Sequence, residues 1–125
     1  MRRALIGSAL LTSLAVAAFV LSAPAAQAAG KTATVKVVNK SNWAIHEMYL
    51  SPVNVEEWGP DQLRQQVIEP NATFTLSGIP CDTWDVKLVD EDGDECVVPD
   101  VDICGGSGTW TIDSKALVAC QQATE

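Results

Sequence analysis

Apolar and polar residues alternate along several short stretches of this chain, which is the pattern of half-buried β-strands. The alternation is clearest in Thr32–Asn39, Thr73–Ser77 and Thr109–Asp113. Trp43–Leu50 has a mixed periodicity and is predicted as a further strand with a bulge. Turn-forming residues separate these stretches at close spacing. The pattern predicts an all-β fold, an antiparallel β-sandwich of six or seven short strands.

The strongest local signal is segment 81–104, CDTWDVKLVDEDGDECVVPDVDIC, in which two alternating runs surround Asp92-Gly93. An Asp-Gly pair favours a two-residue type I′ turn, because both central positions need positive φ. This turn predicts a β-hairpin with one apolar face and a register in which facing residue numbers sum to 185. The resulting pairs are Cys81–Cys104, Trp84–Val101, Val86–Pro99 and Leu88–Val97.

The chain contains four cysteines, and an even number in a small exported domain predicts two disulfides. The hairpin register pairs Cys81 with Cys104. A second hairpin, returning through a last short strand at Ala116–Cys120, would bring Cys96 to Cys120. The spacings contain no C-x-x-C motif, which disfavours a zinc site. We therefore predict two disulfides and no cofactor.

An irregular insertion, residues 53–70, separates two of the predicted strands. Pro60 and Asp61 suit the start of a helix, and Leu63 and Val67 have i, i+4 spacing. The insertion is therefore predicted to contain one short helical turn.

The N-terminal segment 1–28 has the pattern of a secretory signal peptide: Arg2 and Arg3, an apolar stretch, and the cleavage site Ala26-Gln27-Ala28. Its removal leaves residues 29–125 as a single disulfide-stapled domain. Lys+Arg falls from 8 to 6 against 16 acidic residues, a net charge of −10. This charge disfavours nucleic acid and anionic lipid as partners. We predict a secreted protein (extracellular, periplasmic or in the cell envelope) with no membrane insertion after cleavage.

Several motifs occur in an order that resembles an uncharacterised family of small secreted bacterial proteins. They are VKVVNKSNWAIHEMYLSP, EEWGPDQL, CDTWDVKLVDEDG and VDIC. They match the family patterns I-x-x-x-Y-x-S-P, WG-x-D-x-L and C-x-x-x-D-V-x-x-V-D-x-D-G. Some members carry an argininosuccinate lyase name that their length cannot support. The resemblance implies export and a bacterial source, and it adds no mechanism. Cys96 and Cys120 are additional to the family pattern.

His46 is the only histidine, so a Ser-His-Asp arrangement would have to use it with Ser41, Ser51 or Ser77. No G-x-S-x-G motif surrounds these serines, and His46 lies in an apolar stretch. We predict a surface or core-edge histidine and no catalytic residue.

Nine of the sixteen acidic residues lie between Asp82 and Asp102. Asp90, Asp92 and Asp94 suggest a Ca²⁺ loop, but the glycine and glutamate that an EF-hand requires at positions six and twelve are missing. The alternative is a solvated hairpin turn, which we favour.

A second acidic group is Asp85, Asp100 and Asp102. In the predicted register Asp85 faces Asp100, and facing like charges destabilise a sheet. Either a bulge at Pro99 separates them or a cation binds there, and we favour the bulge because proline in a strand marks an edge or a bulge.

Trp58 lies in an acidic loop beside Gly59 and is a candidate recognition residue for a sugar or a protein partner. The alternative is that it folds back as a lid on a small core. Trp84 and Trp110 fall on apolar faces and are predicted to belong to the core.

These observations favour a non-enzymatic binding or structural module with an unknown protein or glycan partner. The alternatives are a small hydrolase that uses an acidic pair and a Ca²⁺-dependent binding module.

Overall fold

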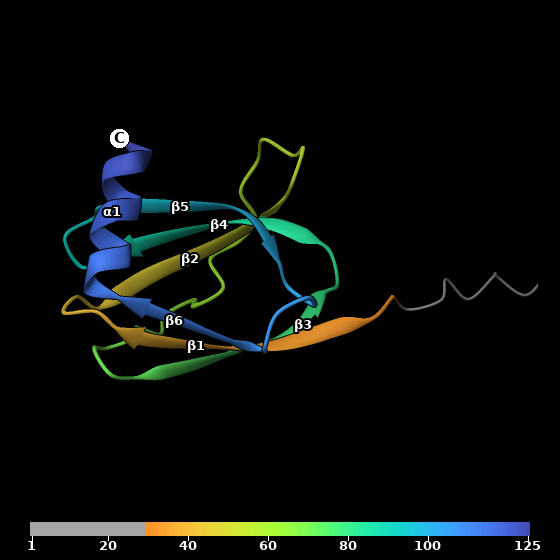
Figure 1. The fold of residues 1–125 in the computed structure, drawn as a ribbon, viewed down its shortest axis with the longest axis horizontal. Helices are drawn as coiled ribbons and strands as arrows, with labels where there is room; N and C mark the ends of the chain where they lie inside the picture. Colours follow the sequence, from red (N-terminus) through yellow and green to blue (C-terminus); the bar gives the residue numbers. More distant parts are fainter. Residues whose placement is uncertain (1–29) are drawn as a thin grey trace, which may run out of the picture.

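The computed structural model describes residues 30–125, and the predicted signal peptide, residues 1–28, lies outside the described residues. The elements are β1 (Thr32–Lys40), β2 (Ile45–Pro52), β3 (Thr73–Pro80), β4 (Thr83–Asp90), β5 (Glu95–Asp102), β6 (Thr109–Asp113) and α1 (Ser114–Thr124). One sheet has the order β3-β1-β6 and the other β2-β4-β5 (Figure 1). The all-β prediction is confirmed, although β1 and β6 pair in parallel.

The core lies between the two sheets because their strands alternate apolar and polar residues, as the sequence predicts. Val37 on β1 and Met48 on β2 have no exposed surface, and Leu88 on β4 is 1 % exposed. These side chains form one cluster that also includes Leu117 of α1. Burying a side chain of this size contributes about 1.5–3 kcal/mol, which explains why the sheets pack face to face.

The central hairpin has its predicted partners only at its open end. There Trp84 faces Val101, as the predicted register requires. Nearer the turn the partners shift by one residue, so that Leu88 faces Cys96 and not Val97. The shift turns Cys96 toward the core, where it is 2 % exposed.

A β-bulge causes this shift, because it leaves Asp85 of β4 opposite both Pro99 and Asp100 of β5. Asp100 has a φ of 56°, and its N–H donates to Oδ1 of Asp85 at 3.1 Å. Proline has no N–H and cannot continue the ladder. The predicted bulge is confirmed, and it places a hydrogen bond where two facing carboxylates would repel each other.

The turn of this hairpin is longer than predicted and runs from Asp90 to Asp94. Asp90 N–H donates to the carbonyl of Asp94, and Gly93 N–H donates to the carbonyl of Asp90. Gly93 has a φ of 81°, whereas Asp92 is not left-handed. The predicted type I′ turn is therefore wrong, and a type I turn followed by a left-handed glycine takes its place.

The last element is a helix, so the predicted strand at Ala116–Cys120 is wrong. The Asp113 side chain caps α1 by accepting the N–H of Ala116 at 2.7 Å. The alanine, leucine, lysine and glutamine residues that follow favour helix. β6 pairs in parallel with β1. The predicted second hairpin, which would bring Cys96 to Cys120, therefore does not form.

The predicted helical turn in the insertion is also wrong, because residues 62–65 form bends and turns and none of residues 60–67 is helical. The side chain of Asp61 accepts the N–H groups of Met48 and Leu63, both at 3.0 Å. Gln62 N–H donates to the carbonyl of Met48 at 2.7 Å. These bonds tie the insertion to the edge of β2, and this tertiary requirement outweighs the local helical preference.

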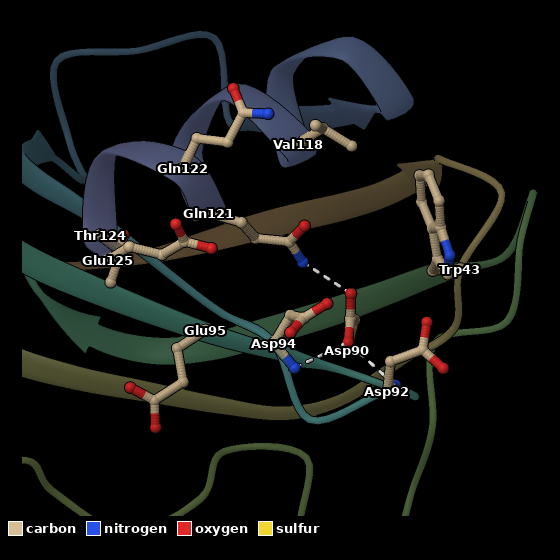
Figure 2. Close-up of a pocket in the computed structure, with 10 residues that line it drawn as sticks. All are labelled: Trp43, Asp90, Asp92, Asp94, Glu95, Val118, Gln121, Gln122, Thr124 and Glu125. Carbon is tan, nitrogen blue, oxygen red and sulfur yellow. Dashed lines mark hydrogen bonds between the residues drawn. The ribbon is translucent and has the colours of Figure 1, made fainter.

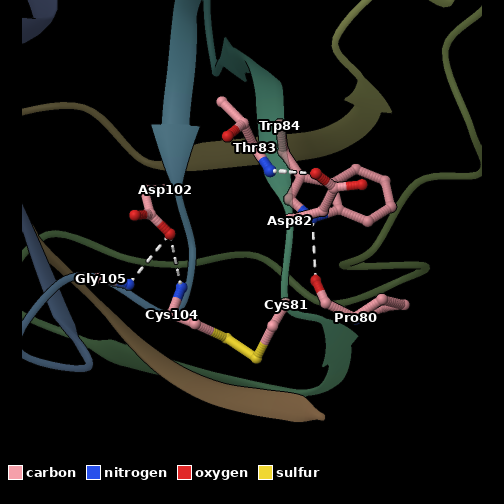
Figure 3. Close-up of a disulfide and its surroundings, with 8 residues drawn as sticks. All are labelled: Pro80, Cys81, Asp82, Thr83, Trp84, Asp102, Cys104 and Gly105. Atoms are coloured by element: carbon pink, nitrogen blue, oxygen red, sulfur yellow. Dashed lines mark hydrogen bonds between the residues drawn. A yellow bond between two sulfur atoms is a disulfide. The ribbon is translucent and has the colours of Figure 1, made fainter. Parts of the chain in front are cut away.

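All four cysteines are paired, with the predicted partners. Cys81, just before β4, bonds to Cys104, just after β5 (Figure 3). Cys96 of β5 bonds to Cys120 of α1, so the second pairing is right although the hairpin that predicted it does not exist. Two disulfides indicate an oxidising compartment. Within the described range, no helix is both long and apolar enough to cross a bilayer.

Candidate functional site

A groove lies between α1 and the turn of the central hairpin (Figure 2). Its volume is about 490 Å³, within the range of about 300–1,000 Å³ that is usual for ligand sites. The helix forms one wall, the turn forms the other, and Trp43 stands at one end. The carboxylates that line this groove, called the acidic groove below, are those of Asp90, Asp92, Asp94, Glu95 and Glu125.

The helix wall is fixed to β5 by covalent and polar contacts. Cys120 is joined to Cys96, and Oγ1 of Thr124 accepts the N–H of Val97 at 2.9 Å. The side chains that face β5 and the turn have the spacing i, i+3, i+4 and i+7 of a single helical face. They are Cys120, Gln121 and Thr124, which contact β5 and the turn, and Leu117, which is buried in the core.

Asp90 connects the two walls of the acidic groove. It is 3 % exposed, and its Oδ1 accepts the N–H groups of Asp92 and Asp94 at 2.9 and 3.0 Å. Its Oδ2 accepts Nε2 of Gln121 at 2.6 Å (Figure 2). Both oxygens therefore have protein donors, which explains the burial of this carboxylate.

The remaining four carboxylates are exposed, and none of the ten residues that line the acidic groove is basic. Their charges give the groove a negative potential. Trp43 adds an aromatic surface, which attracts cations through its ring. This combination suits a lysine or arginine side chain, whose apolar stem can lie on the indole while its charged group meets the carboxylates.

Among the described residues, Asp90, Asp92 and Asp94 form a cluster that could hold a metal ion. Each offers a carboxylate oxygen, and these oxygens lie within 4.8 Å of one another. Calcium takes six to eight oxygen ligands. An ion at this position would compete with the amide of Gln121 for Asp90. The geometry thus favours the solvated turn that we predicted over an ion site.

The structure does not gather Asp85, Asp100 and Asp102 into such a group. Asp85 accepts the N–H of Asp100. Oδ1 of Asp102 accepts the N–H groups of Cys104 and Gly105 at 3.2 and 3.0 Å (Figure 3). A side chain at Gly105 would overlap the Asp102 carboxylate, so it would displace this carboxylate from its backbone donors. Backbone donors account for the positions of Asp85 and Asp102 without a cation.

Trp58 folds back onto the sheet, over its outer face and not over the core. Nζ of Lys87 lies 5.1 Å from the centroid of the Trp58 ring and 4.8 Å from that of Tyr49. The hydroxyl of Tyr49 donates to Glu47 at 2.9 Å. This hydrogen bond, followed by burial, raises the pKa of Tyr49 above its ordinary value of 10.0. Trp84 and Trp110 pack against the core, as predicted.

His46 is exposed at a bulge in β2. The hydroxyls of Ser41 and Ser51 donate to backbone carbonyls, at 2.9 Å to Trp43 and to Val55 respectively. Among residues 30–125 no hydrogen bond links His46 to a serine, so the arrangement needed to activate a serine nucleophile is not assembled.

Sequence reasoning missed the helix wall and Trp43. The signal for the helix was present, because Leu117, Cys120 and Thr124 follow a capping aspartate at helical spacing. No local pattern connects Trp43 with Glu125, since only the fold brings these distant positions together.

Comparisons with family models, with curated proteins and with solved structures find no match to this chain. The resemblance to small secreted bacterial proteins stays a prediction, and a functional proposal has to rest on the geometry of the sites.

Proposed function

We propose that this protein is an exported, non-enzymatic binding module that holds a cationic segment of a partner protein in the acidic groove. The observation that carries the proposal is a groove whose lining contains five acidic residues and one indole and no basic residue. The signal-peptide pattern of residues 1–28, the two disulfides and the family resemblance support export.

A lysine or arginine side chain fits this groove better than a small ion does. The volume of about 490 Å³ accommodates a whole side chain, and the stem can pack on Trp43 and Val118, which line the same groove. The exposed carboxylates of Asp92, Asp94 and Glu125, which line the same groove, would then receive the charged group. Asp90 keeps its bonds to the turn and to α1 in this arrangement.

The alternative of a hydrolase with an acidic pair finds less support. Glycoside hydrolysis needs two carboxylates on opposite sides of a scissile bond. Asp85 and Asp100 are the pair that the sequence suggests, but Asp85 is bonded to the backbone of Asp100 across the bulge. This hydrogen bond gives the pair a structural role, which is to stabilise the bulge.

The proposal is tested with a short fluorescein-labelled peptide of alternating lysine and serine, by fluorescence anisotropy at low salt. The triple variant Asp92→Asn, Asp94→Asn and Glu125→Gln removes three exposed groove charges and leaves the contact between Glu95 and Lys87 in place. We expect it to weaken binding about tenfold or more, or ~1.4 kcal/mol. A peptide with glutamate in place of lysine should not bind.

The matched control is Glu56→Gln, Glu57→Gln and Glu69→Gln, which removes the same charge from exposed positions outside the groove. A general attraction between opposite charges would weaken equally in both variants, since it depends on net charge. Equal losses, or no binding by the wild-type protein, would overturn the proposal.

A further inference from the structure

The first part of the insertion, the loop of residues 53–59, is held in one conformation at the other end of β4 from the acidic groove. The hydroxyl of Ser51, which is 3 % exposed, lies 2.9 Å from the carbonyl oxygens of both Val55 and Glu57. Gly59 N–H donates to the carbonyl of Leu50 at 3.1 Å. A loop with these bonds presents its side chains in fixed positions.

Trp58 is the aromatic residue that this loop presents. The ammonium group of Lys87 lies against its ring and against the ring of Tyr49, 5.1 and 4.8 Å from the two centroids. The same ammonium lies 3.9 Å from the carboxylate of Glu95. These contacts orient the indole before any ligand arrives, and this lowers the entropic cost of binding.

A pocket of about 560 Å³ lies beside Trp58. Its polar lining comes from Ser51, whose hydroxyl is already bonded within the loop, and from Asn54, Glu56 and Asp85. One carboxylate oxygen of Asp85 is already hydrogen-bonded at the bulge, where Oδ1 accepts the N–H of Asp100. Asn54 and Glu56 are exposed, so both can exchange hydrogen bonds with a bound molecule.

We propose that this pocket binds a neutral oligosaccharide. An indole offers a flat apolar surface for the C–H face of a sugar ring, and carboxylate and amide groups hydrogen-bond its hydroxyls. Glu56 and Asp85 would repel an anionic sugar, and the ammonium of Lys87 at the same indole disfavours a cationic one. The proposal is independent of the acidic groove, because the two sites share no lining residue.

The test is isothermal titration of the exported protein with maltohexaose, cellohexaose, xylohexaose, chitohexaose and mannohexaose. We expect at least one of them to bind with a Kd below about 1 mM. Trp58→Ala should weaken that binding about tenfold or more, and Trp58→Phe should lose less because it keeps an aromatic face.

Asn54→Gly gives a second variant that preserves the fold. Asn54 has a φ of 74°, and Asn71, which lies outside the pocket, has a φ of 69°. Glycine accepts this backbone at both positions, so the two substitutions differ only in the pocket. Asn54→Gly should weaken sugar binding about fivefold, whereas Asn71→Gly should bind as the wild type does.

The triple groove variant should also bind the sugar with unchanged affinity. No binding of any of the five sugars up to about 5 mM, or equal binding by Trp58→Ala and the wild type, would overturn the glycan proposal and leave the groove proposal untouched.

Discussion

Asp90 shows how a single side chain decides the local structure on which a site depends. A two-residue turn would leave its carboxylate without the three donors that it has in the structure. The longer turn satisfies the carboxylate and also connects the hairpin to Gln121 on α1. Hydrogen bonds to a charged, buried acceptor are among the stronger ones in proteins. Asp90 therefore holds the acidic groove together without being exposed to a ligand.

Asp90→Ala should lower the free energy of unfolding by about 3 kcal/mol, because it removes three hydrogen bonds and leaves the Gln121 amide without its acceptor. Asp92→Ala, in the same turn but exposed, should change it by less than about 0.5 kcal/mol. Urea unfolding followed by tryptophan fluorescence measures both values. Similar losses in the two variants would contradict the role given to Asp90.

Tyr49 provides a pH-dependent signal from the outer face of the sheet. Its pKa is raised above 10.0, first by the hydrogen bond to Glu47 and then by burial. The folded state therefore keeps the phenol proton longer than the unfolded state does. The stability that this pKa difference of Tyr49 contributes is present below pH 10.0, and it is lost as the pH rises through the folded-state pKa.

Glu47→Gln should return the pKa of Tyr49 toward 10.0, because it removes a carboxylate acceptor and its negative charge. Tyr49 is the only tyrosine, so the ultraviolet absorbance of the phenolate reports it alone. Glu57→Gln is the control, since Glu57 is not among the charges that shift this pKa. An unchanged pKa in Glu47→Gln would show that the hydrogen bond does not exist in solution.

α1 forms one wall of the acidic groove, so the groove depends on the position of this helix. Only Leu117 of this helix is fully buried, so its position depends on the Cys96–Cys120 disulfide and on polar contacts to β5 and to the hairpin turn. The two disulfides have sequence separations of 24 and 23 residues. The chain-entropy model accordingly assigns each about 3 kcal/mol.

Replacing Cys96 and Cys120 by alanine should cost about 3 kcal/mol of stability and increase amide exchange throughout α1. Replacing Cys81 and Cys104 should cost a similar amount but leave exchange in α1 unchanged, because that bridge lies away from the helix. Hydrogen–deuterium exchange compares the two variants. Equal exchange in α1 would mean that its other contacts suffice to hold the helix.

Charge is distributed unevenly over the protein, with nine of its sixteen acidic residues between Asp82 and Asp102. Lys87 is the only basic residue in that range. Repulsion in this segment should be relieved by salt. We expect NaCl to raise the melting temperature, and CaCl₂ to raise it no further at matched ionic strength, because backbone donors already engage Asp85 and Asp102.

Calorimetry in the two salts measures this difference. A bound ion at a hundred times its Kd would add about 2.7 kcal/mol, a shift of several degrees. A Ca²⁺-specific shift that disappears in Asp100→Asn would instead support the cation site of the sequence prediction. Loss of the Ca²⁺-specific shift in Asp92→Asn would instead place the ion in the hairpin turn at residues 90–94.

The sequence predicts most of the sandwich, because period-two alternation specifies strands such as β1 and β4 without knowledge of their partners. It predicts the bulge as well, because Pro99 and two facing aspartates make a regular ladder unfavourable. It does not predict the turn at Asp90, because one of the three donors to this buried carboxylate, Gln121, lies 31 residues away. The acidic groove is unpredictable for the same reason, since the docking of α1 creates it.

Chemical-shift mapping of the acidic groove is the most direct test of the central claim. The ¹⁵N-labelled protein is titrated with the lysine–serine peptide and observed by two-dimensional NMR. The account predicts shifts in residues 90–95, in residues 118–125 and in the indole N–H of Trp43, with the Trp58 loop unaffected. Shifts spread over the whole acidic surface, or concentrated away from the groove, would contradict it.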